Sequence, residues 1–300
     1  MNVEKISNYQ FENDFLYCES FIKGFADKNF KEFDEAAKKI GLTKKIDDLI
    51  SGKIVNNTEN QSALHPKYRS FDENIKISEN LIDAEAKASK FFSSRWNECK
   101  SIGYKSINIV TLGIGGSFEG PKLLLESLNN PISSGKLCSD EVKYKFITGS
   151  DPNEFDQEIR QLKPANTCFI VSSKSFTTDE TIENLKKALE WSGNKRNFIA
   201  ITANPNEVKK FGIKDVIFFD EEIGGRYSIW SPVTQFHLCG EIRKSFIKGG
   251  HKADIDILEN NEYINFIKRI SFTDIFLNNN GKNVRAVLSY IWNLRSLPTY

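Results

Sequence analysis

The clearest fold signal in this chain is Ile107-Asn-Ile-Val-Thr-Leu-Gly-Ile-Gly-Gly-Ser-Phe-Glu-Gly-Pro121. Residues 107–112 are mostly apolar and β-prone, as expected for a strand buried on both faces of a parallel sheet. Glycines then break the run, and residues 121–128 have the composition of a helix. A strand, a glycine turn and a helix in this order point backbone N–H groups at an anion, because glycine allows close approach and the helix N-terminus carries partial positive charge. The stretch predicts a phosphate-binding turn, and a tight turn without a ligand is the structural alternative.

The stretch does not match either of two sequence motifs that bind nucleotides, and this mismatch limits which phosphate ligands are expected. A dinucleotide-binding turn beginning at Gly113 needs glycine at the position of Phe118. A P-loop beginning at Gly115 needs lysine at the position of Pro121. Nucleotides are therefore disfavoured, whereas Ser117 adds a hydroxyl group to the backbone amides of the turn.

Composition and charge describe an ordinary soluble globular protein. The chain has 300 residues, 39% of them hydrophobic and 27% charged, which allows a large core and about two domains. Lys and Arg number 41 against 40 Asp and Glu, so the net charge of +1 gives no reason to expect nucleic acid or an acidic membrane surface as a partner. The first residues lack the pattern of a signal peptide, and no apolar run reaches membrane-spanning length.

The cysteines are odd in number and widely spaced, and they include no C-x-x-C pair: Cys18, Cys99, Cys138, Cys168 and Cys239. This pattern favours reduced thiols, with neither a disulfide framework nor a zinc site. We therefore expect a cytoplasmic protein without a metal.

Apolar periodicity divides the chain into helical and alternating parts. Residues 29–40 and 74–88 have helical spacing, and a polar loop near 56–70 separates them. Further on, strands are predicted at 107–112, 144–148, 167–172, 198–202 and 216–220, with helices at 153–162, 179–191 and 206–211. Strands alternating with helices predict an α/β protein with a doubly wound, five-stranded parallel sheet and flanking helices. Such sheets bind ligands at the carboxyl ends of their strands.

Three parts of the chain follow from this pattern. Residues 1–105 are expected to form an N-terminal helical segment, and residues 106–235 the α/β domain. Residues 236–300 are expected to form a helical connection toward a second domain, with helices predicted near 231–246, 255–270 and 283–294.

A second candidate segment, Ser172-Ser-Lys-Ser-Phe-Thr-Thr-Asp-Glu-Thr181, follows the strand at 167–172. It brings several hydroxyls and a lysine to the start of a helix, where capping alone needs one hydroxyl. Hydroxyl groups and backbone amides suit a terminal phosphate monoester, which offers three acceptor oxygens. Both candidate loops leave carboxyl ends of strands in one sheet, so they are expected to converge on one ligand. A solvated Ser/Thr loop with a good N-cap is the structural alternative.

A third candidate segment, Gly224-Gly-Arg-Tyr-Ser-Ile-Trp-Ser231, again places glycines and hydroxyls at a strand-to-helix junction. The guanidinium of Arg226 is suited to stabilising a developing oxyanion. Taken alone, an arginine beside glycines is more often a surface or ion-pair residue.

Together, these segments resemble the glucose-6-phosphate isomerase family in order and spacing, through Gly113-Ile-Gly-Gly-Ser-x-x-Gly-Pro121, Ser173-Lys-Ser-Phe-Thr-Thr-x-Glu-Thr181 and Gly224-Gly-Arg-Tyr-Ser-x-Trp-Ser231. Leu64-His65 before Arg69 is also similar to a family segment. The resemblance implies a sugar-isomerase (SIS) fold and aldose–ketose exchange between glucose 6-phosphate and fructose 6-phosphate, with no cofactor and no metal. It also implies hexose 6-phosphate as the partner and a homodimer for the complete family member.

The resemblance further implies a role for each matching residue. Gly116 and Ser117 would bind the substrate. Gly225 and Arg226 would lie beside C1 and C2 of the sugar, where Arg226 is the catalytic residue that steadies the enediolate. The phosphate would be held by hydroxyls and one lysine of the second segment, namely Ser173, Lys174, Ser175, Thr177 and Thr178.

The chain departs from the family at two charged positions. Glu119 stands where an apolar residue is usual, and Asp179 stands where glutamine is usual. Each adds negative charge beside the predicted phosphate site, which weakens binding unless the side chain turns away.

The groups that would move protons are missing from these 300 residues. In the family the base is a glutamate in a Glu-Ser-Asn-Gly-Lys segment, and a later histidine and lysine open the sugar ring. Asn278-Asn-Asn-Gly-Lys282 is faintly similar to that segment, but an amide cannot act as the base. His237 and His251 are expected in the core or on the surface. We therefore expect the N-terminal, sugar-phosphate-binding portion of an isomerase, truncated before its base; a non-catalytic sugar-phosphate-binding module or sensor, and a folded remnant without ligand, are the alternatives.

Overall fold

The computed structural model describes residues 9–12, 17–20, 31–32, 35–36, 38–65, 76–128, 142–149 and 151–237. The chain forms two units, one of residues 1–60 with 248–300 and one of residues 61–247. The helices predicted at 255–270 and 283–294 lie outside the described residues, as does the part of the 231–246 helix beyond residue 237.

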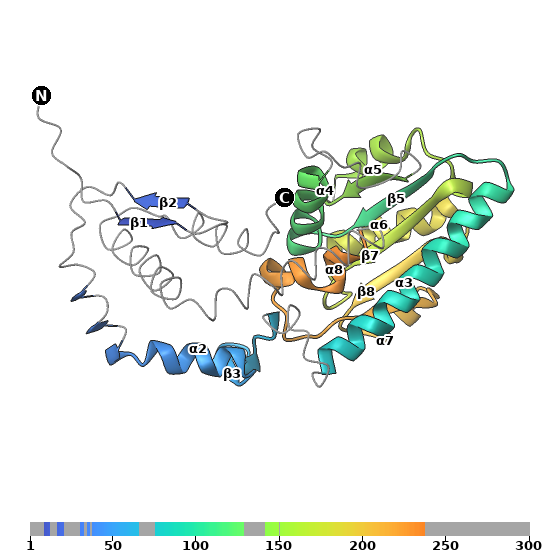
Figure 1. The fold of residues 1–300 in the computed structure, drawn as a ribbon. Coiled ribbons are helices and arrows are strands. Elements are labelled where there is room, and N and C mark those ends of the chain that lie inside the picture. Colours follow the sequence, from blue (N-terminus) through green and yellow to red (C-terminus); the bar gives the residue numbers. More distant parts are fainter. Residues whose placement is uncertain are drawn as a thin grey trace, which may run out of the picture. The chain divides into compact units, whose positions relative to one another are not determined.

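The first unit contains short elements. Strands β1 (Tyr9–Glu12) and β2 (Tyr17–Ser20) pair antiparallel, and helix α2 (Leu42–Ile50) is followed by strand β3 (Ile54–Asn56) (Figure 1). Residues 31–32, 35–36 and 38–39, within the predicted helix at 29–40, are helical. Strands of three or four residues lie at or below the shortest run in which alternation can be recognised, which is why the sequence predicts only helices in this part.

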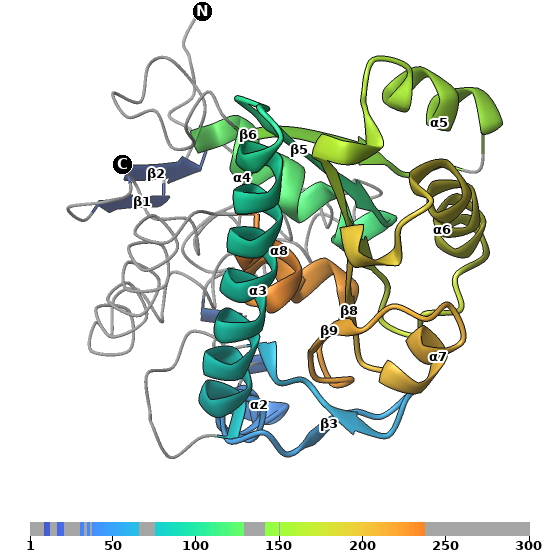
Figure 2. The ribbon, with the colours of Figure 1, turned by 90° about the vertical axis from the view of Figure 1, so that its right-hand side faces the viewer.

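A five-stranded parallel sheet forms the centre of the second unit, as predicted. Its strands are β5 (Ile107–Leu112), β6 (Val142–Ile147), β7 (Thr167–Ser172), β8 (Phe198–Thr202) and β9 (Asp215–Phe218), in the order β6-β5-β7-β8-β9 (Figures 1 and 2). Every residue of β5, β7 and β8 is buried, because these central strands are covered on both faces. The outer strands β6 and β9 carry exposed residues such as Lys143 and Asp215.

Helices cover both faces of this sheet, so the fold is doubly wound. Helices α5 (Pro152–Ile159), α6 (Asp179–Ser192) and α7 (Pro205–Lys209) lie on one face, and α3 (Lys76–Ser101), α4 (Glu119–Leu128) and α8 (Pro232–Gln235) lie on the other (Figure 2). On the first face, the buried rings of Phe169 and Phe198 stack in register with centroids 4.7 Å apart. Short strand β4 (Gln61–Ser62) precedes these elements.

The strand order creates a switch point between β5 and β7. After β5 the chain adds β6 on one side, then returns to add β7 on the other side of β5. The loop after β5 leads to α4 and the loop after β7 leads to α6, on opposite faces of the sheet (Figure 2). Doubly wound sheets bind ligands at this point, outside the carboxyl ends of the two strands.

The element boundaries follow the sequence closely where strands are central. The strands predicted at 107–112, 167–172 and 198–202 are confirmed residue for residue. The outer strands are shifted: β6 begins two residues before the predicted 144–148 and β9 ends two residues before the predicted end at 220. Helix α5 begins as predicted behind Asp151, whose carboxylate accepts a hydrogen bond from the Asn153 N–H at 2.9 Å. Among the described residues, no helix combines the length and the apolar character that crossing a membrane requires.

Candidate functional site

The loop after β5 lies directly against the end of β7. A Cβ atom at Gly113 would lie 2.8 Å from the backbone oxygen of Ser172, so a side chain there would push the two strand ends apart. Gly115 has φ +53°, a left-handed conformation that glycine adopts without strain. Close approach and turn conformation therefore explain these two glycines before any ligand is considered.

The turn that follows determines which groups this loop offers. Residues Gly115–Ser117 form a 3-10 turn before α4 begins. Within the turn, the Ser117 N–H donates to the Ile114 carbonyl at 3.0 Å and the Phe118 N–H donates to the Gly115 carbonyl at 2.9 Å. Two of the amides that the sequence would aim at an anion are thus used internally. The half-buried Ser117 contributes its hydroxyl instead.

The loop after β7 holds its four hydroxyl groups in two pairs. Ser173 Oγ lies 3.1 Å from Thr178 Oγ1, and it also accepts a hydrogen bond from the Phe176 N–H at 3.1 Å. Thr177 Oγ1 donates to Ser175 Oγ at 2.8 Å. Ser173 is buried and Thr178 is half-buried, whereas Ser175 and Thr177 are exposed. The four hydroxyls predicted to bind phosphate therefore lie in one loop and order one another.

This loop is anchored on strand β8 and in the core. The carbonyl oxygen of the half-buried Lys174 accepts hydrogen bonds from the Ala203 N–H and from Thr202 Oγ1, both at 3.0 Å. Phe176 has φ +56° and is 1% exposed, with its ring in the main hydrophobic core. A positive φ is unfavourable for a bulky residue, so the packing of this ring must hold the conformation. The loop is accordingly shaped in advance of any ligand.

Thr178 precedes α6, but its hydroxyl does not cap that helix; it is paired with Ser173. The first turn of α6 instead carries Asp179 and Glu180, whose carboxylates complement the positive end of the helix dipole. A loop that serves only as an N-cap would use the hydroxyl differently, so this alternative is disfavoured. Asp179 is exposed, and it follows directly on the loop.

The loop after β9 touches the loop after β5 through the backbone itself. A Cβ atom at Gly116 would lie 2.0 Å from the backbone oxygen of Gly225, so the two glycine segments are in direct contact. Ser228 Oγ donates to the Gly225 carbonyl at 2.7 Å and to the Gly116 carbonyl at 3.3 Å. Two of the predicted binding residues, distant in the chain, are therefore neighbours in space.

Arg226 lies on the exposed side of this third loop. Its guanidinium carbon is 5.3 Å from the ring centroid of Tyr227, and the Tyr227 ring stacks on His65 with centroids 4.5 Å apart. The N–H of Leu64 also donates to the carbonyl oxygen of Glu222, in the third loop, at 3.2 Å. The segment that precedes the three loops in the chain is thus packed on one of them, while Arg69 lies outside the described residues.

Two serines to which the sequence assigns no role connect the three loops. Ser172, the last residue of β7, is 1% exposed and donates from Oγ to Ser117 Oγ at 3.1 Å. Ser228 connects the first loop to the third, because its hydroxyl donates to the carbonyl oxygens of both Gly116 and Gly225. Both residues fall inside the quoted segments, but their partners follow from strand order, which local sequence patterns do not contain.

His237 belongs to the core. It is fully buried, its Nε2 lies 2.8 Å from Thr111 Oγ1 in β5, and the hydroxyl of Tyr144 in β6 donates to its backbone oxygen at 2.8 Å. Burial lowers the pKa of the imidazole to about 4, so the ring is neutral at neutral pH. Of the two positions expected from the sequence, core and surface, the structure has the core.

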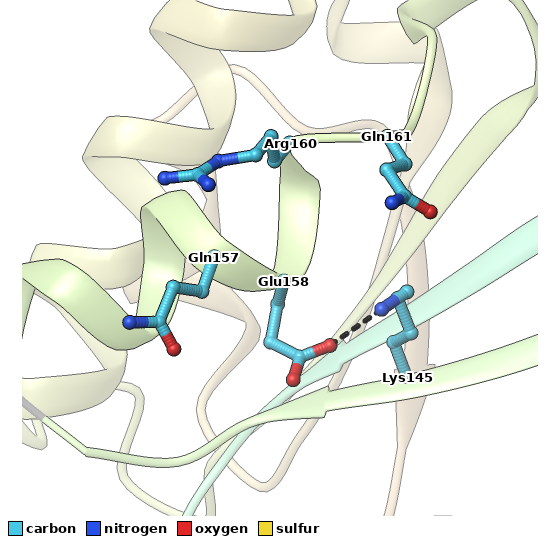
Figure 3. Close-up of a pocket in the computed structure, with 5 residues that line it drawn as sticks. All are labelled: Lys145, Gln157, Glu158, Arg160 and Gln161. Atoms are coloured by element: carbon cyan, nitrogen blue, oxygen red, sulfur yellow. Dashed lines mark hydrogen bonds and ion pairs between the residues drawn. The ribbon is translucent and has the colours of Figure 1, made fainter.

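Two hollows lie along β6, and neither is lined by the predicted site residues. One, of about 250 Å³, is lined by Lys145, Gln157, Glu158, Arg160 and Gln161 (Figure 3). Lys145 Nζ pairs with the Glu158 carboxylate at 2.6 Å, and Arg160 points away from this pair (Figure 3). The lysine and the carboxylate thus satisfy each other. The other hollow is a groove of about 780 Å³ beside α4, with a partly aromatic floor that includes Phe118.

At the carboxyl end of β6, the protein supplies an anion of its own. The Glu154 carboxylate accepts hydrogen bonds from the Thr148 N–H at 3.0 Å and from the Gly149 N–H at 2.8 Å. The carbonyl of Gly149 is in turn bound by Asn184 Nδ2 of α6 at 2.7 Å. The amides at this strand end are therefore already engaged by a carboxylate.

The fold and the loops define a class: a doubly wound α/β protein whose candidate ligand loops meet at the switch point of its sheet. A family model described as phosphoglucose isomerase matches residues 21–300. The chain belongs to the phosphoglucose isomerase family.

Individual relatives agree with this assignment. The chain is 33% identical over 275 residues to a glucose-6-phosphate isomerase of Legionella pneumophila (strain Paris), covering 86% of this chain and 50% of that protein. It is 29% identical over 296 residues to the corresponding protein of Shewanella frigidimarina, covering 91% and 53%. A crystal structure of a glucose-6-phosphate isomerase from Chlamydia trachomatis has the same fold, with a TM-score of 0.65 and 20% identity over 90% of this chain and 51% of that one. The chain spans about half the length of the curated relatives it matches.

Proposed function

We propose that this chain forms the hexose-phosphate-binding part of a glucose-6-phosphate isomerase. The observation that carries the proposal is the meeting of three loops at one edge of the sheet, where Gly116 contacts Gly225 and Ser117 contacts Ser172. Membership of the phosphoglucose isomerase family indicates the reaction, and the loops supply the groups that a sugar phosphate requires.

The loop after β7 is proposed to hold the phosphate, with Ser173, Lys174, Ser175, Thr177 and Thr178 as its ligands. A hydroxyl can rotate its proton toward an incoming oxygen while its own oxygen stays in place. The two hydroxyl pairs can therefore donate to a phosphate monoester without moving the loop, which keeps the ordering cost of binding small. Lys174 adds a positive charge to the same loop.

The other two loops are proposed to face the sugar. Gly116, Ser117 and Gly225 would contact it, and Arg226 would lie beside C1 and C2. Isomerisation removes the proton on C2 of the aldose and returns a proton to C1, and the intermediate enediolate carries negative charge on oxygen. A fixed guanidinium stabilises that charge as it develops, which is the role proposed for Arg226.

The base is not assigned to any of the 300 residues. The Glu-Ser-Asn-Gly-Lys segment implied by the family resemblance does not occur among them. A general acid or base typically contributes about 10²–10⁴-fold to the rate. This chain alone is therefore expected to bind hexose phosphate while turning it over very slowly or not at all. The second candidate is a sugar-phosphate-binding module without catalysis.

We also propose hexose 6-phosphate as the small-molecule partner, a homodimer for the complete enzyme, and a cytoplasmic location. The family membership supports the first two, and the five widely spaced cysteines support the third.

Calorimetric titration with fructose 6-phosphate, followed by an isomerase assay on the same sample, tests the proposal. We expect binding by the wild-type chain, and loss of that binding in the double variant Ser175→Ala, Thr178→Ala. Ser101→Ala is the control, because that exposed hydroxyl only caps the end of α3 through the Glu98 carbonyl at 2.8 Å.

Binding without turnover would support a hexose-phosphate-binding part that lacks its base. Turnover would show that the acid and base groups lie among residues to which no role is assigned. A wild-type chain that gives no binding would contradict the proposal.

A further inference from the structure

We propose that Ser172 is a positioning residue of the sugar-phosphate site, whose hydroxyl orients the hydroxyl of Ser117 toward the substrate. The inference rests on the proposed function, because Ser117 is one of the residues proposed to contact the sugar. Ser172 itself would not touch the ligand. It would act through Ser117 alone.

The place of Ser172 in the sheet makes it a rigid support. It is the last residue of β7 and is paired in register with Ile201 of β8. On its other side, Val171 is paired with Leu112 of β5, so the next residue, Gly113, lies alongside Ser172. The absent Cβ of Gly113 lets the strand ends meet closely, which brings the Ser172 side chain within reach of the first loop. Being 1% exposed, Ser172 is held by its surroundings and not by water.

The direction of the hydrogen bond decides what Ser117 can offer. Ser172 Oγ donates to Ser117 Oγ at 3.1 Å. A serine hydroxyl has one proton to donate and two lone pairs. Because Ser117 accepts from Ser172, its own proton remains for donation, and every oxygen of a sugar phosphate can accept it. Without Ser172, the Ser117 hydroxyl would rotate among its staggered positions and would lose this preferred orientation.

Ser228 differs from Ser172 in what it positions: Ser228 contacts backbone atoms, whereas Ser172 contacts a side chain. The hydroxyl of Ser228 donates to the carbonyl oxygens of Gly116 and Gly225, and so holds the two loops together. Ser172 bonds to a side-chain hydroxyl that is half-buried and proposed to meet the substrate. Its effect should therefore depend on whether Ser117 has a hydroxyl to orient.

A double-mutant cycle in ligand affinity tests this dependence. The wild-type chain, Ser172→Ala, Ser117→Ala and the double variant are titrated calorimetrically with fructose 6-phosphate. We expect Ser172→Ala to weaken binding roughly five-fold, the worth of one neutral hydrogen bond. In the Ser117→Ala background, the same substitution is expected to change affinity by less than about two-fold, because its partner is gone. A merely structural role would lower affinity by the same factor in both backgrounds.

Ser192→Ala is the matched control, because it removes a buried hydroxyl at the other end of α6, where Ser192 Oγ accepts from Asn197 Nδ2 at 2.8 Å. Its affinity should equal that of the wild type. If Ser172→Ala does not fold, Ser172→Cys replaces it, since a thiol is only a weak donor. Unchanged affinity in the Ser172 variant, or equal factors in both backgrounds, would overturn the inference and leave the proposed function standing. A wild-type chain that does not bind would overturn the proposed function, and the inference with it.

Discussion

The carboxyl ends of β6 and β7 lie at the same edge of one sheet, but they end in opposite ways. At β6, the Glu154 carboxylate binds the amides of Thr148 and Gly149. At β7, the loop presents paired hydroxyls such as Ser173 and Thr178, which are neutral and can donate to an anion. The carboxylate at β6 is negatively charged and repels a phosphate, whereas the hydroxyls at β7 are neutral and do not. Of these two strand ends, only the one at β6 is already engaged by a carboxylate, which supports the proposal that a phosphate binds at the switch point.

The largest effect is expected where the first and third loops touch. Gly116→Ala would place a methyl group 2.0 Å from the backbone oxygen of Gly225, a clash that only a loop displacement relieves. We expect the free energy of unfolding to fall by about 3 kcal/mol or more, the upper range for overpacking, and fructose 6-phosphate binding to be lost. Urea unfolding and calorimetry measure the two effects.

Gly225→Ala is the control for stability, because a Cβ atom there would meet nothing within 4 Å. Equal destabilisation by the two substitutions would show that the first and third loops are not in contact. It would then contradict a binding site formed where these loops meet.

Acid is expected to act on the β6 side of the comparison, because His237 is bonded to β6 through Tyr144 and to the neighbouring strand β5 through Thr111. Its pKa is about 4 when buried and 6.5 when unperturbed, so the unfolded chain takes up the proton more readily. The stability contributed by the neutral ring is complete above about pH 6.5 and is lost as the pH falls toward about 4, by about 3 kcal/mol at most.

Urea unfolding at about pH 7.5 and about pH 5 measures this loss. The variant His237→Gln should be less stable at the higher pH and should lose less stability between the two. An identical loss in variant and wild type would mean that other groups cause the acid sensitivity.

Removing Glu154 should make the end of β6 resemble that of β7. In Glu154→Ala the amides of Thr148 and Gly149 lose their acceptor, which costs about 1–3 kcal/mol of unfolding free energy. Added inorganic phosphate should then raise the thermal midpoint of the variant more than that of the wild type, because the amides are open to an anion. Glu158→Ala, which breaks only the pair with Lys145, is the control. A phosphate effect of equal size in all three proteins would contradict the role given to Glu154.

The smallest effect concerns the charge beside the loop after β7, which is proposed to hold the phosphate. Asp179→Asn removes an exposed carboxylate in the first turn of α6, and it should raise the affinity for fructose 6-phosphate by roughly two- to five-fold at low salt. Glu190→Gln, near the other end of the same helix, should leave the affinity unchanged. The gain should shrink as salt is added, and a gain that persists in high salt would not be electrostatic.

The sheet could be predicted because its central strands are buried on both faces and therefore mostly apolar. Glycine, proline and hydroxyl residues mark where these strands end. The run Ile107–Leu112 needs no tertiary information to be recognised as a strand, and the loops after it follow from the same punctuation. The outer strand β6 was less well bounded, since Val142 and Lys143 belong to an edge that is only partly covered.

What the sequence did not contain is the meeting of residues across loops. Ser172 reaches Ser117 because β7 was added beside β5 and not beside β6, and this order is a property of the whole sheet. The hydrogen bond from the Ser117 N–H to the Ile114 carbonyl could not be predicted from the sequence either. It depends on a 3-10 turn that stands in place of the first turn of a helix. The roles of the loop residues in binding stay predictions.

Chemical-shift mapping of the backbone amides during titration with fructose 6-phosphate tests the central claim most directly. We expect the largest shifts in the loop Ser173–Thr178, with accompanying shifts at Ser117 and Gly225 and no change at Thr148 and Gly149. Shifts concentrated at Thr148 and Gly149, or a loop after β7 that does not respond, would contradict it.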